Sequence, residues 1–237
     1  TLLDTLSDLE RYYAFMDKYE VLKQYFGYDA FRDGQEKMID AITSGRDVLG
    51  IMPTGAGKSL CYQIPALMAG ENGGITLVIS PLISLMKDQV SALNQAGVHA
   101  AYLNSSLTSG QYYKALGYAR EGRYPIIYVA PERLLTPEFL DFAVHAKIAM
   151  VAVDEAHCVS QWGQDFRPGY LKIEEFLCTL PKRPVVSAFT ATATAEVRDD
   201  IIDLLKLQDP VVTTTGFDRP NLYFEVQSPK DKYAAVK

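Results

Sequence analysis

The stretch IMPTGAGKSLCYQIP (51–65) joins a strand pattern to a helical pattern through a glycine-rich turn. Gly55 and Gly57 permit a tight turn whose backbone N–H groups converge at a helix N-terminus, an arrangement that favours phosphate. Lys58 would place its charge on the β- and γ-phosphates of a nucleotide, and the Ser59 hydroxyl could ligate Mg²⁺. The alternative is a plain glycine-rich turn with an exposed lysine, and the strand–loop–helix context argues against it.

Short β-branched apolar runs alternate with helical patterns from residue 46 onward. This alternation predicts βαβ crossovers, and therefore an α/β fold with a mostly parallel central sheet and helices on both faces. In such sheets ligands bind at the carboxyl ends of the strands. The expected strands are 47–52, 75–80, 99–103, 126–130, 149–153, 185–190 and 211–215. The expected helices are 59–68, 82–96, 109–121, 169–179 and 194–205.

The chain divides into three parts by pattern. Residues 1–45 are helical, rich in tyrosine and without a strand signal, and Met16 could be a natural start. Residues 46–216 carry the strand–helix alternation. Residues 217–237 turn at Pro220 and begin a new apolar run, as expected for a linker and the start of a further domain.

Composition narrows the class of protein. No apolar run approaches the roughly 20 residues that span a bilayer, and no signal peptide is expected. The three cysteines are too far apart for a disulfide framework or a zinc site, which favours a reducing, cytoplasmic compartment. The net charge of −6 excludes a generally basic nucleic-acid coat, so nucleic acid would have to bind at a local patch.

The run IAMVAVDEAH (148–157) is a buried-strand pattern that ends in two carboxylates. Asp154 would hold Mg²⁺, directly or through water, and Glu155 would orient and deprotonate the water that attacks the γ-phosphate. An Asp-Glu pair by itself is usually a solvated strand end, but the upstream glycine-rich loop favours the functional interpretation. His157 is open between proton transfer, a hydrogen-bond link to a neighbouring segment, and a core histidine.

An aromatic segment, SQWGQDFRP (160–168), directly follows these carboxylates. The faces of Trp162 and Phe166 could stack on unpaired bases, for about 1–3 kcal/mol per base. Arg167 could add a phosphate or cation–π contact. The alternative is a satellite core beneath a long loop.

Eight blocks occur in a defined order between about residues 20 and 226: FGYDAFRDGQ, MPTGAGKS, VISPLISLMKDQV, YVAPERL, VDEAH, SQWGQDFRP, FTATAT and FDRPNL. In this order they resemble the first motor domain of the RecQ-type DNA helicases, within the second helicase superfamily. The resemblance implies a RecA-like P-loop NTPase fold and an ATP-dependent 3′–5′ DNA helicase of DNA repair and recombination. The implied cofactors are ATP and Mg²⁺, and the implied partners are single-stranded and partly duplex DNA.

The resemblance also assigns roles around the nucleotide. The Gln35 amide matches a residue that recognises adenine, since an amide can donate and accept at once, and Tyr28 would pack against the base. The implied nucleotide-binding set is Tyr28, Arg32, Gln35, Thr54, Gly55, Ala56, Gly57, Lys58 and Ser59. The implied catalytic residues are Lys58, Asp154, Glu155 and His157, with Ser59 and Asp154 as Mg²⁺ ligands.

Further residues match segments that contact DNA or couple hydrolysis to strand movement. Most such charges belong to solvated helix faces, and Thr192 or Thr194 could instead cap a helix. The implied DNA-binding and coupling set is Ser80, Ser84, Lys87, Arg133, Trp162, Phe166, Arg167, Thr190 and Thr192.

Three positions depart from the family pattern. Asp33 stands where proline is usual in the upstream loop, which would make that loop less rigid. Ala56 replaces a common glycine of the phosphate loop. Gln164 occupies the place of a histidine in the aromatic segment, so no role of that histidine is carried over.

In this family an arginine from a second RecA-like domain completes the site, and no such block follows Asn221. We therefore expect this chain alone to bind nucleotide, to hydrolyse it very slowly and not to unwind DNA. A bacterial, nucleoid-associated protein is expected. Two alternatives remain: a non-catalytic single-stranded nucleic-acid binding module, and a P-loop nucleotidase that acts on a small molecule.

Overall fold

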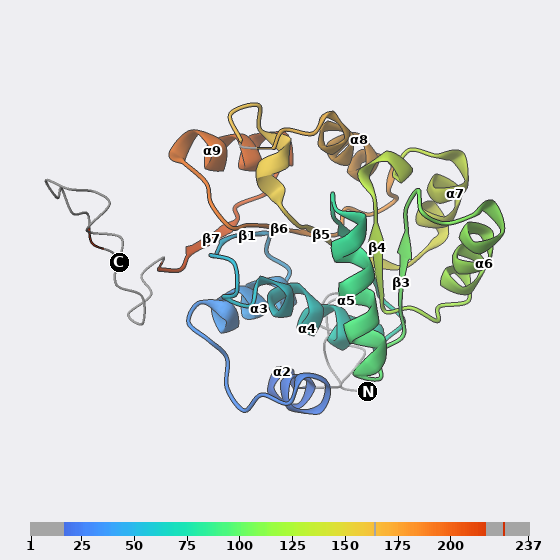
Figure 1. The fold of residues 1–237 in the computed structure, drawn as a ribbon, viewed down its shortest axis with the longest axis horizontal. Coiled ribbons are helices and arrows are strands. Elements are labelled where there is room, and N and C mark those ends of the chain that lie inside the picture. The colour runs from blue at the N-terminus through green and yellow to red at the C-terminus, as the bar shows by residue number, and fades with distance from the viewer. Residues whose placement is uncertain (1–16, 164, 217–224, 226–237) are drawn as a thin grey trace, which may run out of the picture.

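A seven-stranded parallel sheet forms the centre of the molecule (Figure 1). The computed structural model describes residues 17–163, 165–216 and 225. The strand order is β3-β4-β2-β5-β6-β1-β7, and all neighbouring strands run parallel. The strands are β1 (Val48–Ile51), β2 (Ile75–Ile79), β3 (Ala100–Leu103), β4 (Ile126–Val129), β5 (Ile148–Val153), β6 (Val185–Thr190) and β7 (Val211–Thr214). Each lies within one residue of its expected bounds, so the predicted parallel α/β sheet is confirmed.

Helices cover both faces of the sheet, which explains why its inner strands are continuous apolar runs. The first face carries α2 (Lys18–Val21), the π-helical turn η2 (Leu22–Phe26), α3 (Gln35–Thr43), α4 (Lys58–Gly70) and α5 (Ile83–Gln95). The second face carries α6 (Ser109–Arg120), α7 (Pro137–His145), α8 (Lys172–Thr179) and α9 (Ala195–Leu204).

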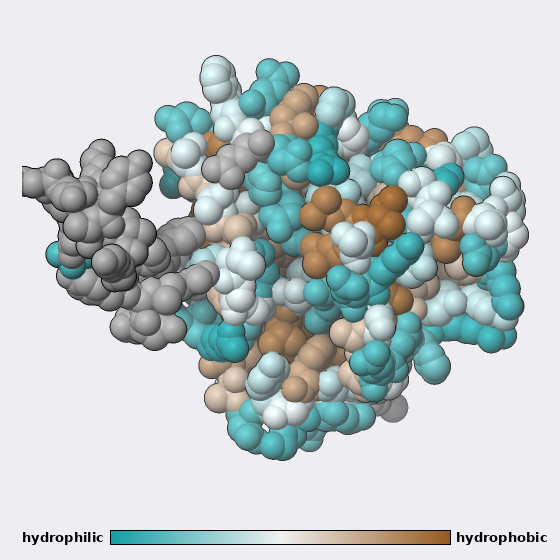
Figure 2. Space-filling model, in the orientation of Figure 1, coloured by the Kyte–Doolittle hydropathy of each residue, from teal (hydrophilic) through white to brown (hydrophobic). Residues whose placement is uncertain are grey.

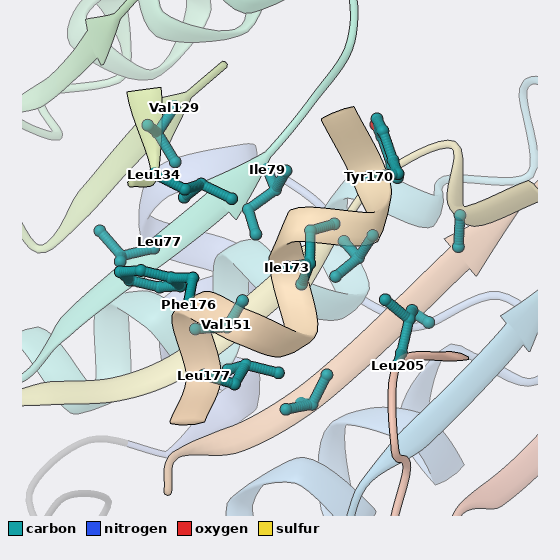
Figure 3. Close-up of a cluster of buried hydrophobic side chains, with 14 of the residues drawn as sticks. Leu77, Ile79, Val129, Leu134, Val151, Tyr170, Ile173, Phe176, Leu177 and Leu205 are labelled. Carbon is teal, nitrogen blue, oxygen red and sulfur yellow. The ribbon is translucent and has the colours of Figure 1, made fainter. Parts of the chain in front are cut away.

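Alternating strand residues supply a separate apolar core to each face. Figure 3 shows part of the core on the second face, where Ile173, Phe176 and Leu177 of α8 pack with Leu77 and Val151 of the sheet. All five side chains are buried, so α8 is held by burial of its apolar stripe rather than by helix propensity.

Two helical predictions need correction. The expected helix 169–179 is wrong in its first turn, because Pro168–Leu171 form the 3-10 turn η5 before α8 begins. This tighter turn places the Tyr170 hydroxyl 2.8 Å from the Asp154 carbonyl oxygen. Helix α7 was not expected; it begins with Pro137 at its first position and has only nine residues, too few to show a clear period.

Short 3-10 turns line the carboxyl edge of the sheet: η3 (Pro131–Arg133) follows β4, and η4 (Ala156–Val159) follows β5. Among the residues that the structure describes, no helix combines the length and the apolar character that a membrane crossing requires.

Asp47 connects three segments at the amino ends of the strands, opposite the end that carries the glycine-rich loop. Its carboxylate, only 3 % exposed as a residue, accepts two hydrogen bonds from the Arg183 guanidinium, at 3.1 and 2.6 Å. It also accepts from the backbone N–H of Val186 at 2.9 Å and of Gln208 at 2.7 Å. One buried carboxylate therefore fixes the starts of β1 and β6 and the turn that leads to β7.

We expect Asp47→Ala to lower the free energy of unfolding by about 3–5 kcal/mol, because the Arg183 charge and two backbone N–H groups lose their acceptor. Urea denaturation followed by circular dichroism measures this loss. The matched control is Asp141→Ala, which removes an exposed pair with Arg120 and should cost less than about 1 kcal/mol. Equal losses in both variants would contradict the role given to Asp47.

Candidate nucleotide site and aromatic loop

The glycine-rich loop between β1 and α4 needs its glycines for two separate reasons. Gly55 and Gly57 have φ values of +85° and +87°, in the left-handed region that favours glycine. A Cβ on Gly57 would also lie 2.4 Å from Nε2 of Gln35. No side chain caps the N-terminus of α4, so its first N–H groups remain available to an anion. In this structure the Lys58 ammonium donates to the Met52 carbonyl at 3.1 Å.

The loop upstream of α3 (residues 26–35) is held against the glycine-rich loop by side-chain hydrogen bonds. Gln35 is buried; its Oε1 accepts from the Arg32 backbone N–H at 2.8 Å, and its Nε2 donates to the Gly57 carbonyl at 3.0 Å. The Arg32 guanidinium donates to the Gly55 carbonyl at 2.6 Å. Both ends of the Gln35 amide therefore bind protein groups here, and adenine recognition by Gln35 stays a prediction.

A cavity of about 490 Å³ opens beside these loops, within the size range of small-molecule sites. It brings together nearly all of the predicted nucleotide residues: Tyr28, Arg32, Gln35, Thr54, Gly55, Gly57, Lys58, Ser59, Asp154 and Glu155. The predicted residue Ala56 does not line it. Its wall also contains residues that the sequence analysis missed: Phe26, Ala30, Leu60, Gln63, Leu85 and Gln89.

Asp154 lies at the end of β5 and is almost completely buried. Burial, with the neighbouring Glu155 charge as the second cause, raises the pKa of its carboxyl from 3.8 to about 6. The backbone N–H of Glu155, which donates to Oδ1 of Asp154 at 3.1 Å, and the charge of Lys58 both lower this pKa. The cavity therefore holds a carboxylate that would be stabilised by a cation.

Glu155 and His157 turn away from β5 through an unusual backbone conformation. Glu155 has φ 48° and ψ 47°, which is uncommon for a residue other than glycine and often marks a functional site. Nδ1 of His157 lies 2.9 Å from the Thr190 hydroxyl and 3.4 Å from a Glu155 carboxylate oxygen. The Thr190 hydroxyl donates its single hydrogen to the Thr192 carbonyl at 3.0 Å. In the contact with His157 the hydroxyl oxygen is therefore the acceptor and the protonated Nδ1 of His157 is the donor. These contacts favour the interpretation of His157 as a hydrogen-bond link.

The aromatic segment (160–168), hereafter the aromatic loop, packs at its N-terminal end against the residues that follow Asp154 and Glu155. The Ser160 hydroxyl donates to Asp200 of α9 at 2.6 Å and accepts from the Trp162 backbone N–H at 3.1 Å. A Cβ on Gly163 would lie 2.3 Å from the His157 carbonyl oxygen, so only glycine allows this close approach. The Trp162 side chain is 79 % exposed, which contradicts the satellite-core alternative for this residue.

The far end of the aromatic loop is bound to two other segments. The Arg167 guanidinium donates to the Pro81 carbonyl at 3.1 Å and pairs with Asp165 at 2.7 Å. The buried Tyr170 hydroxyl donates to the Asp154 carbonyl. Arg167 therefore anchors the loop to the start of α5 in this conformation, and Tyr170 anchors it to the end of β5. Sequence reasoning missed Tyr170, whose only signal was an aromatic residue just beyond the loop.

The structure separates the predicted DNA-contact residues into exposed and buried ones. Ser84 and Lys87 are exposed on α5, near whose start Figure 2 shows hydrophobic residues gathered at the surface. Ser80 is buried, and its hydroxyl has no hydrogen-bond partner among the described residues. The Arg133 guanidinium lies 5.0 Å from the Tyr112 ring centre. Neither Ser80 nor the His157-bound Thr190 faces solvent here.

Thr192 is exposed, whereas Thr194 caps α9 by accepting from the Val197 backbone N–H at 3.3 Å. Phe166 is half-buried. The predictions for Gln164, for residues 1–15 and for the FDRPNL block (217–222) lie outside the described residues.

A phosphate-type loop after β1 and a carboxylate pair after β5 define a RecA-like P-loop nucleotide-binding domain. A model of the family described as "DEAD/DEAH box helicase" matches residues 32–201. The chain belongs to this family.

Two curated relatives carry the name of the RecQ group. The chain is 50 % identical over 213 residues to "ATP-dependent DNA helicase RecQ" of Bacillus subtilis, covering 90 % of this chain and 36 % of that protein. It is 49 % identical over 205 residues to the protein of the same name from Pasteurella multocida, covering 86 % of this chain and 32 % of that protein. The resemblance to the RecQ group is therefore confirmed, and the chain spans about a third of the length of these relatives.

Solved structures support the fold. A "hypothetical ATP-dependent RNA helicase" from Sulfolobus tokodaii superposes with a TM-score of 0.61 at 24 % identity, covering 83 % of this chain and 56 % of that one. At this level of identity the similarity establishes the shared architecture.

We expect Asp154→Asn to stabilise the nucleotide-free chain at neutral and alkaline pH. A folded-state pKa of about 6, raised from 3.8, means that the carboxyl contributes stability below about pH 4 and loses it as the pH rises through 6. At pH 8 the variant should gain at most about 3 kcal/mol, since one pKa unit corresponds to about 1.4 kcal/mol.

Thermal unfolding in EDTA at pH 5 and pH 8 tests this expectation, with the exposed Asp88 changed to Asn as the control. The gain of Asp154→Asn should be larger at pH 8. A gain that is independent of pH, or a loss at pH 8, would contradict the burial argument.

Proposed function

We propose that this chain is the first motor domain of a RecQ-type DNA helicase, which binds and hydrolyses ATP with Mg²⁺ and couples hydrolysis to single-stranded DNA binding. We keep the division into a helical segment (1–45), a RecA-like domain (46–216) and a linker with the start of a second domain (217–237). The names of the bacterial RecQ relatives support this proposal, together with a role in DNA repair and recombination.

One observation carries the proposal. Residues 154–170 form a continuous segment that has a buried carboxylate at one end and an exposed tryptophan in its loop, and Tyr170 returns to bind the Asp154 carbonyl. A ligand that binds Trp162 therefore contacts a loop whose two ends are both joined to Asp154, one through the chain and the other through the Tyr170 hydrogen bond. A nucleotidase acting on a small molecule would have no use for this exposed aromatic side chain.

The residues around the cavity suit a nucleoside triphosphate. The backbone N–H groups at the start of α4 and the Lys58 ammonium would bind the phosphates. The Ser59 hydroxyl and the Asp154 carboxylate both line the cavity, and oxygen donors of this kind are those that Mg²⁺ prefers. Bound Mg²⁺ would supply neutralising charge at the phosphates. Glu155 also lines the cavity, and its carboxylate would orient and deprotonate the water that attacks the γ-phosphate.

The exposed residues Ser84, Lys87 and Trp162 would contact DNA, together with the half-buried Arg133. Contacts of serine and basic side chains with phosphates position a strand without selecting its sequence, and aromatic stacking adds affinity for unpaired bases. We also propose 3′–5′ movement along the strand, binding to partly duplex DNA, and a cytoplasmic, nucleoid-associated location in a bacterium.

We expect Lys58→Ala to weaken ATP binding by about 100-fold, because two charge-assisted hydrogen bonds to phosphate of about 1.5 kcal/mol each are lost. Isothermal titration calorimetry with Mg²⁺ and a non-hydrolysable ATP analogue measures the change. Lys87→Ala, which removes the same charge from α5, is the control and should keep the affinity. Unchanged affinity in Lys58→Ala would favour a binding module with a vestigial nucleotide site.

We expect Trp162→Ala to keep ATP affinity and to lose most of the stimulation of ATP hydrolysis by single-stranded DNA. The reason is that the exposed ring is the part of the loop most open to base stacking. The measurement is steady-state ATP hydrolysis by the longest natural chain that carries this sequence, with and without single-stranded DNA. Tyr113→Ala, an exposed aromatic residue on α6, is the control, and equal stimulation in wild type and Trp162→Ala would refute the sensing role.

A further inference from the structure

The first four residues of the aromatic loop, 160–163, form a tight turn with Trp162 at its third position, hereafter the tryptophan turn. The Gly163 backbone N–H donates to the Ser160 carbonyl at 3.1 Å, which closes the turn. The Trp162 backbone N–H donates to the Ser160 hydroxyl, also at 3.1 Å. Both hydrogen bonds end on Ser160, so the position of the Trp162 ring depends on where Ser160 is held.

A carboxylate of α9 holds Ser160 in place. Ser160 is completely buried, and its hydroxyl donates to a carboxylate oxygen of the half-buried Asp200 at 2.6 Å. Because a hydroxyl has only one hydrogen, this bond leaves the oxygen free to accept from the Trp162 N–H. A hydrogen bond to an ionised acceptor is also stronger than one between neutral groups. One side chain of α9 therefore fixes the group that directs the tryptophan turn.

Packing does not replace this bond at the tip of the turn. The preceding turn η4 packs against α9 through buried apolar side chains. Beyond Ser160, however, a cavity of about 240 Å³ is lined by Trp162 on the turn and by Thr194 and Val197 at the start of α9. The Trp162 side chain is 79 % exposed. The tryptophan turn is therefore held to α9 mainly by the bond between Ser160 and Asp200.

Helix α9 is also joined to the nucleotide edge of the sheet through the segment before it. Residues 190–194 lead from the end of β6 directly into α9. At the start of this segment the Thr190 hydroxyl accepts from Nδ1 of His157, two residues after the Glu155 carboxylate. A displacement of the tryptophan turn that reaches α9 through Asp200 therefore acts on a segment that is bonded close to Glu155.

We propose that Asp200 is a positioning residue for the response to single-stranded DNA. By holding Ser160, it keeps the Trp162 ring presented to an unpaired base and passes the effect of base binding to α9. The proposal rests on the proposed function, because it needs DNA to bind at Trp162 and ATP hydrolysis to respond. The sequence does not single out Asp200, since Asp199 and Asp203 lie on the same helix.

The first test uses the single tryptophan of the chain, whose fluorescence reports on Trp162 alone. The decay of fluorescence anisotropy without DNA measures how freely the ring moves. Asp200→Ala should enlarge the fast, local part of this decay, because the turn loses its anchor. Asp203→Ala, which removes an exposed carboxylate from the same helix, should leave the decay as in wild type. Asp200→Asn should recover most of the wild-type decay, because its amide oxygen can still accept from Ser160.

The second test is steady-state ATP hydrolysis by the longest natural chain that carries this sequence, measured over a range of single-stranded DNA concentrations. Asp200→Ala should raise the DNA concentration for half-maximal stimulation by about tenfold, the factor expected for the loss of one hydrogen bond to a charged group. The rates without DNA and at saturating DNA should stay close to those of wild type. A general loss of stability would not produce this split, and Asp203→Ala should not show it.

A further pair of variants guards against a failure to fold. Circular dichroism and thermal unfolding establish that each variant is folded. If Asp200→Ala is not, Asp200→Leu against Asp200→Asn is the deciding comparison, since the two side chains are of similar size and only the amide accepts a hydrogen bond. Asp200→Leu should then show the loosened ring and the weaker DNA response, and Asp200→Asn should not.

The outcomes separate the two proposals. If single-stranded DNA does not stimulate the wild type, the proposed function fails and the role of Asp200 in the DNA response falls with it. If the wild type is stimulated, but Asp200→Ala matches it in either the anisotropy decay or the DNA dependence, the role of Asp200 is refuted and the proposed function stands. Equal changes in Asp200→Ala and Asp203→Ala would refute it as well.

Discussion

All seven strands run in one direction, and the rest of the molecule depends on this constraint. Parallel strands send every strand-to-helix loop out at the same edge of the sheet. The strand order then decides which loops meet. Because β5 lies between β2 and β6, the segment after it can reach both neighbours. The Asp154 backbone N–H donates to the Ile79 carbonyl of β2, and His157 bonds to Thr190 of β6.

The same edge holds an electrostatic conflict. Asp154 is buried beside a second carboxylate, and both the burial and the neighbouring charge disfavour its ionised form. At neutral pH the ionised Asp154 carboxylate is therefore destabilised, and a bound cation would relieve this cost. Lys58 lines the same cavity as Asp154 and Glu155, and its charge partly offsets this cost by lowering the pKa of Asp154.

The aromatic loop is attached to its surroundings at several points along its length. Ser160 holds it to α9, Arg167 to the start of α5, and Tyr170 to Asp154. Only Trp162 projects clearly into solvent among these residues. A force applied to that ring would be shared by three fixed points around the nucleotide site.

The sequence by itself determined the sheet and the main parts of the site. Apolar runs bounded by glycine and polar residues mark strands because a strand covered on both faces must be apolar throughout. The glycine-rich loop and the Asp154–Glu155 pair were predictable because their chemistry depends on neighbours in the chain. Helix α7 was not, because nine residues after a proline give too little periodicity.

Tertiary structure alone decided which distant groups bind one another. It placed the Gln35 amide against the Gly57 carbonyl, the Arg167 guanidinium on the Pro81 carbonyl, and the Tyr170 hydroxyl on Asp154. It also joined Gln63 to both Tyr128 and Gln89 through the Gln63 amide nitrogen. Local pattern reports only whether a residue suits its own helix or strand. The partner of a hydrogen bond is set by the order and register of strands far apart in the chain, and that information appears only when the sheet has formed.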